Sequence, residues 1–379
     1  MQSTTRKPRL AAIEYIRGIS MMGVIGIHIG SQYIMNPAAN IHLVALLETV
    51  TRFSVPIFFF ISAFGLFYNL NIQEPFNFTA FTKRRLKTVL IPYLAWSLFY
   101  LVHDGLLYGV GFPDPLHLLA ILFFGNAKYQ LYFMVILLWF YLLMPLWIAL
   151  VRKLTIPRLA LLLVLQIAFD YWSSFSTSFN LYVYGLPDSS LLKPFLMYRL
   201  NYWVLHYFFI FLLGGYLSVH SQKFMAFMKQ HLHGLTCFFF FTLGGLLTYY
   251  YEKIFLDGYT ALDAINTAHQ LCPWGIFYTI AASLFFFALF TYVKFSPAVN
   301  QALHLLGQHS YFAYLVHPLI ITYISLLFQQ QGLIMTAPLI IGFYLATLLL
   351  AILAAILCRK LGEHFALINE LTIGVYPKK

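Results

Sequence analysis

Long apolar runs constrain this chain more than any other feature, because stretches of about 17–25 apolar residues can cross a bilayer as helices. Hydrophobic residues make up 61% of the chain and charged residues only 9%, whereas soluble chains carry roughly 25% charge. The sequence therefore predicts an all-α membrane protein, a polytopic bundle of about ten transmembrane helices. The expected spans are 10–31, 43–69, 86–108, 129–151, 158–175, 199–219, 234–251, 273–295, 310–328 and 333–358.

The lysines and arginines between these runs orient the bundle. Lys and Arg concentrate on the cytoplasmic side of membrane proteins, and most of them here fall on one side, so both termini are expected in the cytoplasm. That side holds Arg6, Lys7, Arg9, the cluster 83–87, Arg152, Lys153, Arg158, Lys223, Lys229, Lys294, Arg359, Lys360, Lys378 and Lys379. The other side holds Lys128, Lys193, Arg199 and Lys253. The apolar run 116–124 is too short to cross, and we expect an interfacial or re-entrant piece there.

The remaining composition points to one domain with no partner of the nucleic-acid class. The net charge of +11 is explained by the one-sided cations, so it does not indicate nucleic-acid binding. Cys237, Cys272 and Cys358 have no pair spacing, which predicts neither a disulfide framework nor a metal site. We find no internal repeat and no soluble domain at either end of the chain.

Two polar side chains inside the first run are the strongest candidates for chemistry. Arg17 and His28 are eleven residues apart, which places them within about 20° on one helix face and about 16 Å apart along it. A buried Arg costs at least about 2.5–3.5 kcal/mol on insertion scales, so both side chains are expected to line a pocket through the membrane. Neutral His28 can take a proton from a hydroxyl, or it can simply pack and bond a carbonyl. Glu14 lies one turn below Arg17 and can be a plain ion-pair partner.

Three further segments carry polar groups that can have either a structural role or a role in catalysis or binding. The cluster Lys83-Arg84-Arg85-Leu86-Lys87 either pins its loop in the cytoplasm or also grips phosphates. His317 precedes Pro318 in the ninth run, where it can serve a proline kink or a site. Ser62 follows Pro56 in the second run, and it can bond back to its own helix.

Taken together, these motifs resemble the acyltransferase-3 family of integral membrane acyltransferases, which modify cell-surface sugars. The resemblance covers about residues 8 to 358. Lys87 stands where the family usually has Arg, Ala63 replaces the usual Gly, and the acidic residue nearest after His28 is Glu48, so the partner of His28 stays open. The stretches that carry it are Glu14-x-x-Arg17-Gly18 with the spacing to His28, Ser54-Val55-Pro56 through Ser62-Ala63-Phe64, Arg84-Arg85-Leu86-Lys87 with Ile91-Pro92-Tyr93, and Tyr311-x-x-Tyr314-Leu315-x-His317-Pro318-Leu319.

The resemblance implies residue roles. His28 would be the catalytic histidine and Arg17 its essential companion, and we group Glu14 with them. The donor's phosphates would meet Arg84, Arg85 and Lys87, with Arg17 further along. We assign His317 and Ser62 to substrate binding.

The resemblance also implies a reaction. The donor would be cytoplasmic acetyl-CoA or another acyl-CoA, with no metal, and the acceptor a hydroxyl of an extracytoplasmic carbohydrate or cell-envelope glycan. Residues 1–379 would form a single transmembrane acyltransferase domain in the bacterial plasma membrane, without a fused extracytoplasmic domain. The alternative is a transporter or exporter of small anions or lipid-linked glycans, since intramembrane Arg and His also suit a substrate path. A receptor-like scaffold without activity is a third class.

Overall fold

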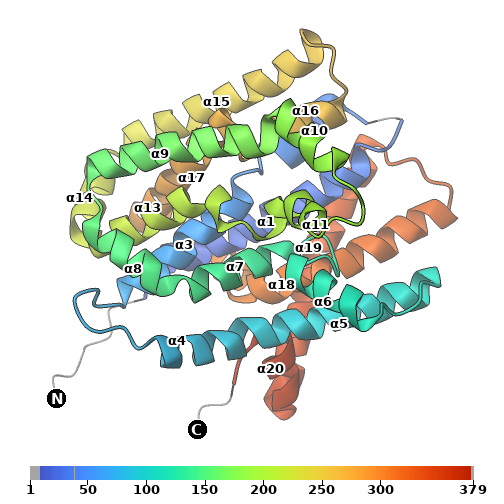
Figure 1. The fold of residues 1–379 in the computed structure, drawn as a ribbon, viewed down its shortest axis with the longest axis horizontal. Coiled ribbons are helices and arrows are strands. Elements are labelled where there is room, and N and C mark those ends of the chain that lie inside the picture. The colour runs from blue at the N-terminus through green and yellow to red at the C-terminus, as the bar shows by residue number, and fades with distance from the viewer. Residues whose placement is uncertain (1–8, 38, 377–379) are drawn as a thin grey trace.

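A computed structural model describes residues 9–37 and 39–376, and over these residues the fold is helical, without a β-strand (Figure 1). Arg6, Lys7, Lys378 and Lys379, which entered the charge pattern above, lie outside the described residues. The all-α prediction is thus confirmed for the described part of the chain.

Eight helices of the described residues are long and apolar enough to cross a membrane. Three of them are composite and include a π-helical turn, in which one extra residue widens the helix. The eight are α1 (Ala11–Tyr33), Ile41–Tyr68 (α2 Ile41–Val44, η1 Ala45–Thr49, α3 Ser54–Tyr68), Phe78–Tyr108 (α4 Phe78–Arg85, η2 Leu86–Leu90, α5 Ile91–Tyr108), Ile156–Phe175 (α9 Ile156–Asp170, η3 Tyr171–Phe175), α15 (Leu232–Phe255), α17 (Pro273–Tyr292), α18 (Pro297–Gln330) and α19 (Ala337–His364).

The two other expected spans are not single straight helices. The run 129–151 forms α7 (Tyr132–Leu142) and α8 (Met144–Lys153), bent by 66° at Pro145, which has no N–H to continue the helix. The run 199–219 forms α12 (Arg199–Tyr202), the 3₁₀ turn η4 (Val204–His206) and the short helix α13 (Phe208–Val219). The described residues therefore hold eight candidate spans, or nine with the bent pair, and the expected count of ten is not confirmed.

Shorter helices complete the bundle. The apolar run 116–124 forms α6 (Pro115–Phe124), a helix of 10 residues, which agrees with the prediction that it is too short to cross. The others are α10 (Thr177–Gly185), α11 (Leu192–Met197), α14 (Ser221–Gln230), α16 (Ala261–Thr267) and α20 (Ala366–Ile373).

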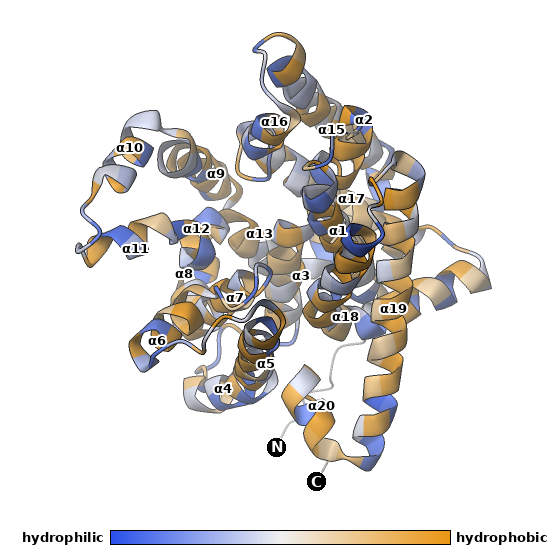
Figure 2. Cartoon of the chain, turned by 90° about the vertical axis from the view of Figure 1, so that its right-hand side faces the viewer, coloured by the Kyte–Doolittle hydropathy of each residue, from blue (hydrophilic) through white to orange (hydrophobic). Residues whose placement is uncertain are grey.

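The bundle has two chemically different ends. We call the end that holds Arg9, the cluster 83–87 and Arg152-Lys153 the basic end; α4, α8 and α14 lie there, toward the left of Figure 1. The opposite end, with α6, α10, α11 and α16, we call the far end. Figure 2 looks onto the far end and shows α1 among α3, α17 and α18, the helices against which it packs.

Two glycines let α1 and α18 approach closely. A Cβ on Gly18 would lie 2.9 Å from the backbone nitrogen of Gly307, and a Cβ on Gly307 would collide with the carbonyl oxygen of Glu14. Small residues at a crossing allow such backbone contact between membrane helices. Because the two helices run in the same direction, His28 and His317 meet ten residues further along each of them.

Candidate active site

The ring of His28 packs against two other rings. Its centroid lies 4.4 Å from that of Tyr129 and 5.3 Å from that of His317, the latter in a stacked arrangement with 20° between the planes. Tyr129 comes from the loop between α6 and α7, and His317 is fully buried on α18. Three separate elements thus bring their rings together around the predicted catalytic imidazole.

His28 lines a cavity of about 280 Å³ in the far half of the bundle. Ser31 and Ile34 at the end of α1 and residues of α16 close its far side. Its wall is apolar with a few polar groups, as is usual for small-molecule sites. The lining residues are Val24, Ile27, His28, Ser31, Ile34, Arg52, Val55, Phe58, Gln130, Tyr132, Phe133, Leu262, Ile265, Asn266, Gln270 and Tyr314.

Pro318 within α18 frees a backbone carbonyl of the helix close to His317. Pro318 lacks the N–H that would bond the carbonyl of Tyr314 one turn earlier. The neighbouring Leu315 carbonyl accepts the Tyr100 hydroxyl at 2.6 Å and the Gln130 side-chain amide at 3.5 Å. Polar side chains of α5 and of the loop before α7 therefore bond the backbone of α18 beside the proline.

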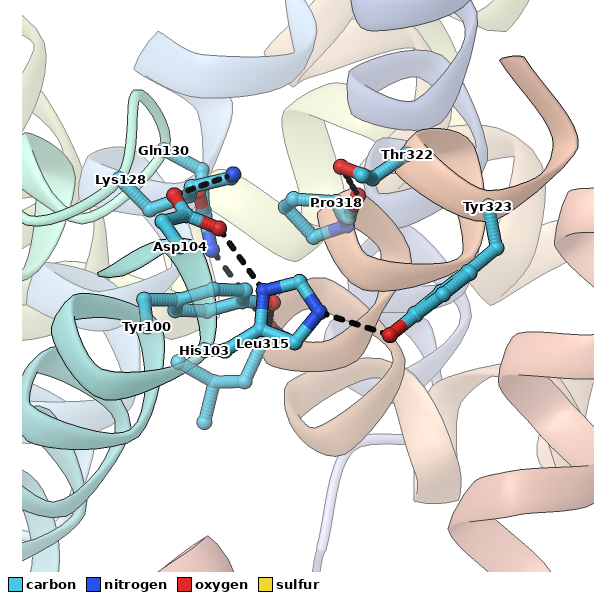
Figure 3. A network of polar contacts seen from close by, with 9 residues as sticks. All are labelled: Tyr100, His103, Asp104, Lys128, Gln130, Leu315, Pro318, Thr322 and Tyr323. Atoms are coloured by element: carbon cyan, nitrogen blue, oxygen red, sulfur yellow. Dashed lines mark hydrogen bonds and ion pairs between the residues drawn. The ribbon is translucent and has the colours of Figure 1, made fainter. Parts of the chain in front are cut away.

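A polar network at the far end anchors the loop that carries Tyr129 (Figure 3). Asp104 on α5 accepts from Lys128 Nζ at 2.7 Å and lies 2.8 Å from His103 Nδ1. The other ring nitrogen of His103 lies 3.0 Å from the hydroxyl of Tyr323 on α18. Because Lys128 immediately precedes Tyr129, the network fixes the place of the tyrosine ring over His28.

A buried acid–base pair forms another wall of the cavity. Glu48, in the π-helical turn η1, lies 2.7 Å from Arg52 Nη2 and accepts the Ser31 hydroxyl at 2.7 Å. Gly30 makes room for it, because a Cβ there would lie 2.8 Å from the Glu48 side chain. The sequence left the partner of His28 open with Glu48 nearest, and the described contacts of Glu48 go to Ser31 and Arg52.

Arg17 lies in the basic half of the bundle, away from the cavity of His28. Its side chain is exposed although Ile16 and Gly18 beside it are buried, so it reaches an open space. It interacts electrostatically with Arg85 and with Tyr141, and the Arg85 guanidinium lies 4.9 Å from the Tyr141 ring centroid. The lining of the His28 cavity includes Val24 but not Arg17, so the expected single pocket with both side chains on its wall is not seen among the described cavities.

The other predicted donor-site residues do not form one patch. Lys87, two residues after Arg85, faces the other way: its Nζ lies 5.4 Å from the ring centroid of Tyr376, as expected because residues two apart on a helix do not face each other. Arg84 is exposed between them. A donor role for Arg84, Arg85 and Lys87 stays a prediction.

Glu14 and Ser62 lie away from the His28 cavity. The Glu14 carboxylate lies 2.8 Å from Arg9 Nη2 and 2.9 Å from His304 Nδ1, so it has ion-pair partners at the basic end besides its electrostatic interaction with Arg17. Ser62 is half-buried on α3 and is absent from the cavity lining. Their catalytic and substrate-binding roles stay predictions.

The sequence analysis missed a buried polar triad. Asp170 on α9 lies 2.7 Å from His206 Nδ1 and accepts from the Gln166 amide at 2.7 Å, with the histidine and aspartate side chains fully enclosed. Ionisable residues inside apolar runs were the available signal. The pairing itself was hidden because the partners come from different runs.

A family match decides the class of the protein. The family described as an acyltransferase domain matches residues 10–356, nearly the whole chain. The chain belongs to the acyltransferase-3 family. This confirms the resemblance found in the four sequence stretches and, with the apolar helices, makes the protein a multi-pass acyltransferase-domain protein of the bacterial cell membrane.

Curated relatives are distant but cover most of the chain. A protein of Staphylococcus aureus strain MRSA252, named "Probable poly-beta-1,6-N-acetyl-D-glucosamine export protein", is 23% identical over 328 residues, which is 83% of this chain and 83% of that protein. The protein of the same name from strain MSSA476 matches over the same lengths with the same identity. No solved structure matches the chain significantly.

Proposed function

We propose that this acyltransferase moves an acyl group from cytoplasmic acyl-CoA through the bundle to a hydroxyl of an extracytoplasmic glycan. The observation that carries the proposal is the placement of His28: a histidine on the wall of a far-end cavity, on the same helix face as an arginine that reaches an open space at the basic end. The family match supports acyl transfer as the reaction.

The donor enters at the basic end in this account. Arg17 and Arg85 would meet its phosphates, because guanidinium groups bind phosphate with two parallel hydrogen bonds. The thin pantetheine arm then covers the roughly 16 Å of helix between Arg17 and His28. Met21, which lies between Arg17 and His28 along α1, is fully buried, so the packing around it has to open to admit the arm.

The chemistry takes place beside His28. The imidazole removes the proton of the acceptor hydroxyl while that oxygen attacks the thioester carbonyl, the carbon–sulfur bond breaks, and the imidazolium returns the proton to the leaving thiolate. The apolar wall, which includes Val24, Ile27 and Phe133, restricts water and limits hydrolysis of the donor. A transient acyl-His28 intermediate is an alternative route through the same residue.

The acceptor glycan and the acyl group are proposed from the relatives and the family, not from the geometry of the site. The printed names of the relatives refer to poly-β-1,6-N-acetyl-D-glucosamine, which supports a cell-envelope polysaccharide as the acceptor. The acyl group is proposed to be acetyl because that group is common in the family.

The same printed names favour a second candidate, export of a glycan. An exporter would move the glycan without consuming acyl-CoA. We favour acyl transfer because the sequence shows no inverted repeat of the kind that builds many transporters.

One assay separates the two candidates. Purified protein is given labelled acetyl-CoA and an amino-sugar oligosaccharide, and mass spectrometry follows the acceptor. We expect a gain of one acetyl group with the wild type and with His42→Ala, a far-end histidine bonded to Tyr251, and loss of the gain with His28→Ala. Glycan flux in liposomes without donor consumption would instead establish the exporter.

A further inference from the structure

A second cavity, of about 240 Å³, adjoins the cavity of His28. The two share five lining residues, so they lie against each other on opposite sides of a common set of side chains, and we treat them together as a double cavity. Their combined size falls in the range of about 300–1,000 Å³ usual for ligand sites. The shared residues are Arg52, Tyr132, Ile265, Asn266 and Gln270, and the second cavity adds Leu200, Asn201, Tyr207, His269 and Leu271.

Carboxamides dominate the polar lining of this double cavity. Gln130, Asn201, Asn266 and Gln270 all line it. The side-chain nitrogens of Gln130 and Asn201 already donate to protein oxygens, which leaves the amide oxygens of these two residues as acceptors. The Gln270 side-chain oxygen is buried and has no hydrogen-bond partner among the described residues. An amide offers both donors and an acceptor, which matches the hydroxyl and acetamido groups of sugars, and a buried oxygen without a partner favours a ligand that donates to it.

The lining carries no uncompensated charge. Arg52 is its only charged side chain among the residues of the two cavities, and it is paired with the fully buried Glu48. The Nδ1 atom of His269 accepts the Leu271 backbone N–H at 3.2 Å, so the neutral ring carries its proton on Nε2 and can donate it. An anionic ligand would find no free cation here, whereas a neutral polyhydroxyl ligand finds amides and an N–H.

We propose that the second cavity is a glycan subsite, which takes the sugar next to the one whose hydroxyl faces His28. The acceptor is then a neutral chain of at least two sugars, held by the amides of the double cavity and by His269. The assignment of the reacting hydroxyl rests on the proposed acyl transfer, whereas the binding of the neighbouring sugar does not require turnover.

The test measures binding to purified wild-type protein without any donor. A neutral amino-sugar disaccharide is compared with its monosaccharide by a fluorescence-label displacement assay. We expect the disaccharide to bind about tenfold more tightly, the gain of one or two net hydrogen bonds. Equal dissociation constants for the two sugars would overturn the subsite.

Two variants locate the subsite in the second cavity. Leu200→Trp fills its wall, and His269→Ala removes the N–H donor; neither residue lines the cavity of His28. Each should reduce disaccharide affinity toward the monosaccharide value and leave monosaccharide affinity unchanged. The control His233→Ala, on α15, should keep the preference. A preference that survives Leu200→Trp contradicts the proposal.

A charged probe tests the neutrality of the site. A disaccharide of the same size with a carboxylate on the second sugar should bind several-fold more weakly than the neutral one, and tighter binding would overturn the assignment. Donor-free binding also separates the two claims: chain-length preference without acyl transfer rejects the proposed function and keeps the subsite. Acyl transfer without chain-length preference rejects the subsite alone.

Discussion

The imidazole of His28 is held by ring faces, with Tyr129 on one side and His317 on another. Ring packing fixes the plane of the imidazole without adding a charge next to it. A base held in this way depends on its aromatic neighbours for orientation, and Tyr129 in turn depends on the Asp104–Lys128 pair that anchors its loop.

Replacing Tyr129 therefore tests orientation apart from chemistry. Tyr129→Ala should lower kcat for acyl transfer about tenfold with donor KM unchanged, because the imidazole loses one wall while the donor contacts remain. Tyr129→Phe keeps the ring and should retain most of the activity, and equal losses in both variants would assign the effect to the hydroxyl.

Two residues of the basic cluster 83–87 are expected to differ in their effect on donor binding. Arg85→Ala should raise donor KM about tenfold because Arg85 lies close enough to Arg17 to interact with it electrostatically, and a lost charge-assisted bond costs about 1.5–3 kcal/mol. Lys87→Ala should leave donor KM unchanged because its ammonium lies over Tyr376. Donor saturation curves of the two variants measure this, and equal shifts would contradict the division.

His269 gives the protein a pH-dependent stability. Burial, followed by the positive charges of Arg52 and His206, lowers the pKa of His269 to about 3 from its usual 6.5. The unfolded chain binds this proton below pH 6.5 and the folded chain does not, so stability falls as the pH drops from 6.5 toward 3. Thermal unfolding in detergent should show a smaller loss of melting temperature between about pH 7 and about pH 4.5 for His269→Gln than for the wild type. An identical loss would contradict this assignment.

At the scale of elements, the crossing of α1 and α18 sets the active site. The Gly18–Gly307 contact fixes the distance between the helices, and their parallel course then places His28 beside His317. Next to Pro318 of α18, the Leu315 carbonyl accepts hydrogen bonds from Tyr100 and Gln130. Helix packing far from the histidines thus controls their separation.

Gly307→Ala should push the two helices apart, because its Cβ would collide with the Glu14 carbonyl. We expect a lower melting temperature and a lower kcat. Gly342→Ala on α19 is the matched control: no atom lies within 4 Å of its added Cβ, and alanine is favoured over glycine in helices by roughly 0.5–1 kcal/mol. Gly307→Ala with unchanged stability and activity would show that the crossing does not set the site.

The helical runs could be predicted from the sequence because length and hydropathy alone define a membrane span. The bend at Pro145 had a visible signal, whereas the break of 199–219 did not. There, Arg199 donates to the Ser173 carbonyl and His206 pairs with Asp170. Contacts with other segments therefore set the backbone conformation of 199–219. The sequence placed Arg17 and His28 on one face, but it could not show that Met21 between them is fully buried or that the cavity of His28 does not include Arg17, because packing between helices is not encoded in spacing.

At the scale of the whole molecule, the described residues form two chemically different halves, and α1 carries Arg17 in one half and His28 in the other. In the proposed function the basic half would offer Arg17 and Arg85 to an anionic donor, and the far half would offer the space around His28 that carries amide residues on its wall. The excess of Lys and Arg at the basic end predicts that this end faces the cytoplasm. Donor and acceptor would then meet from opposite sides of the membrane.

Sided transfer in liposomes tests this account most directly. Protein is reconstituted in one orientation, labelled acetyl-CoA is supplied only at the basic end, and the oligosaccharide is supplied only at the far end. The account predicts acetylated oligosaccharide with the wild type, none with His28→Ala, and none when donor and acceptor exchange sides. Equal product from both arrangements, or product from His28→Ala, would contradict it.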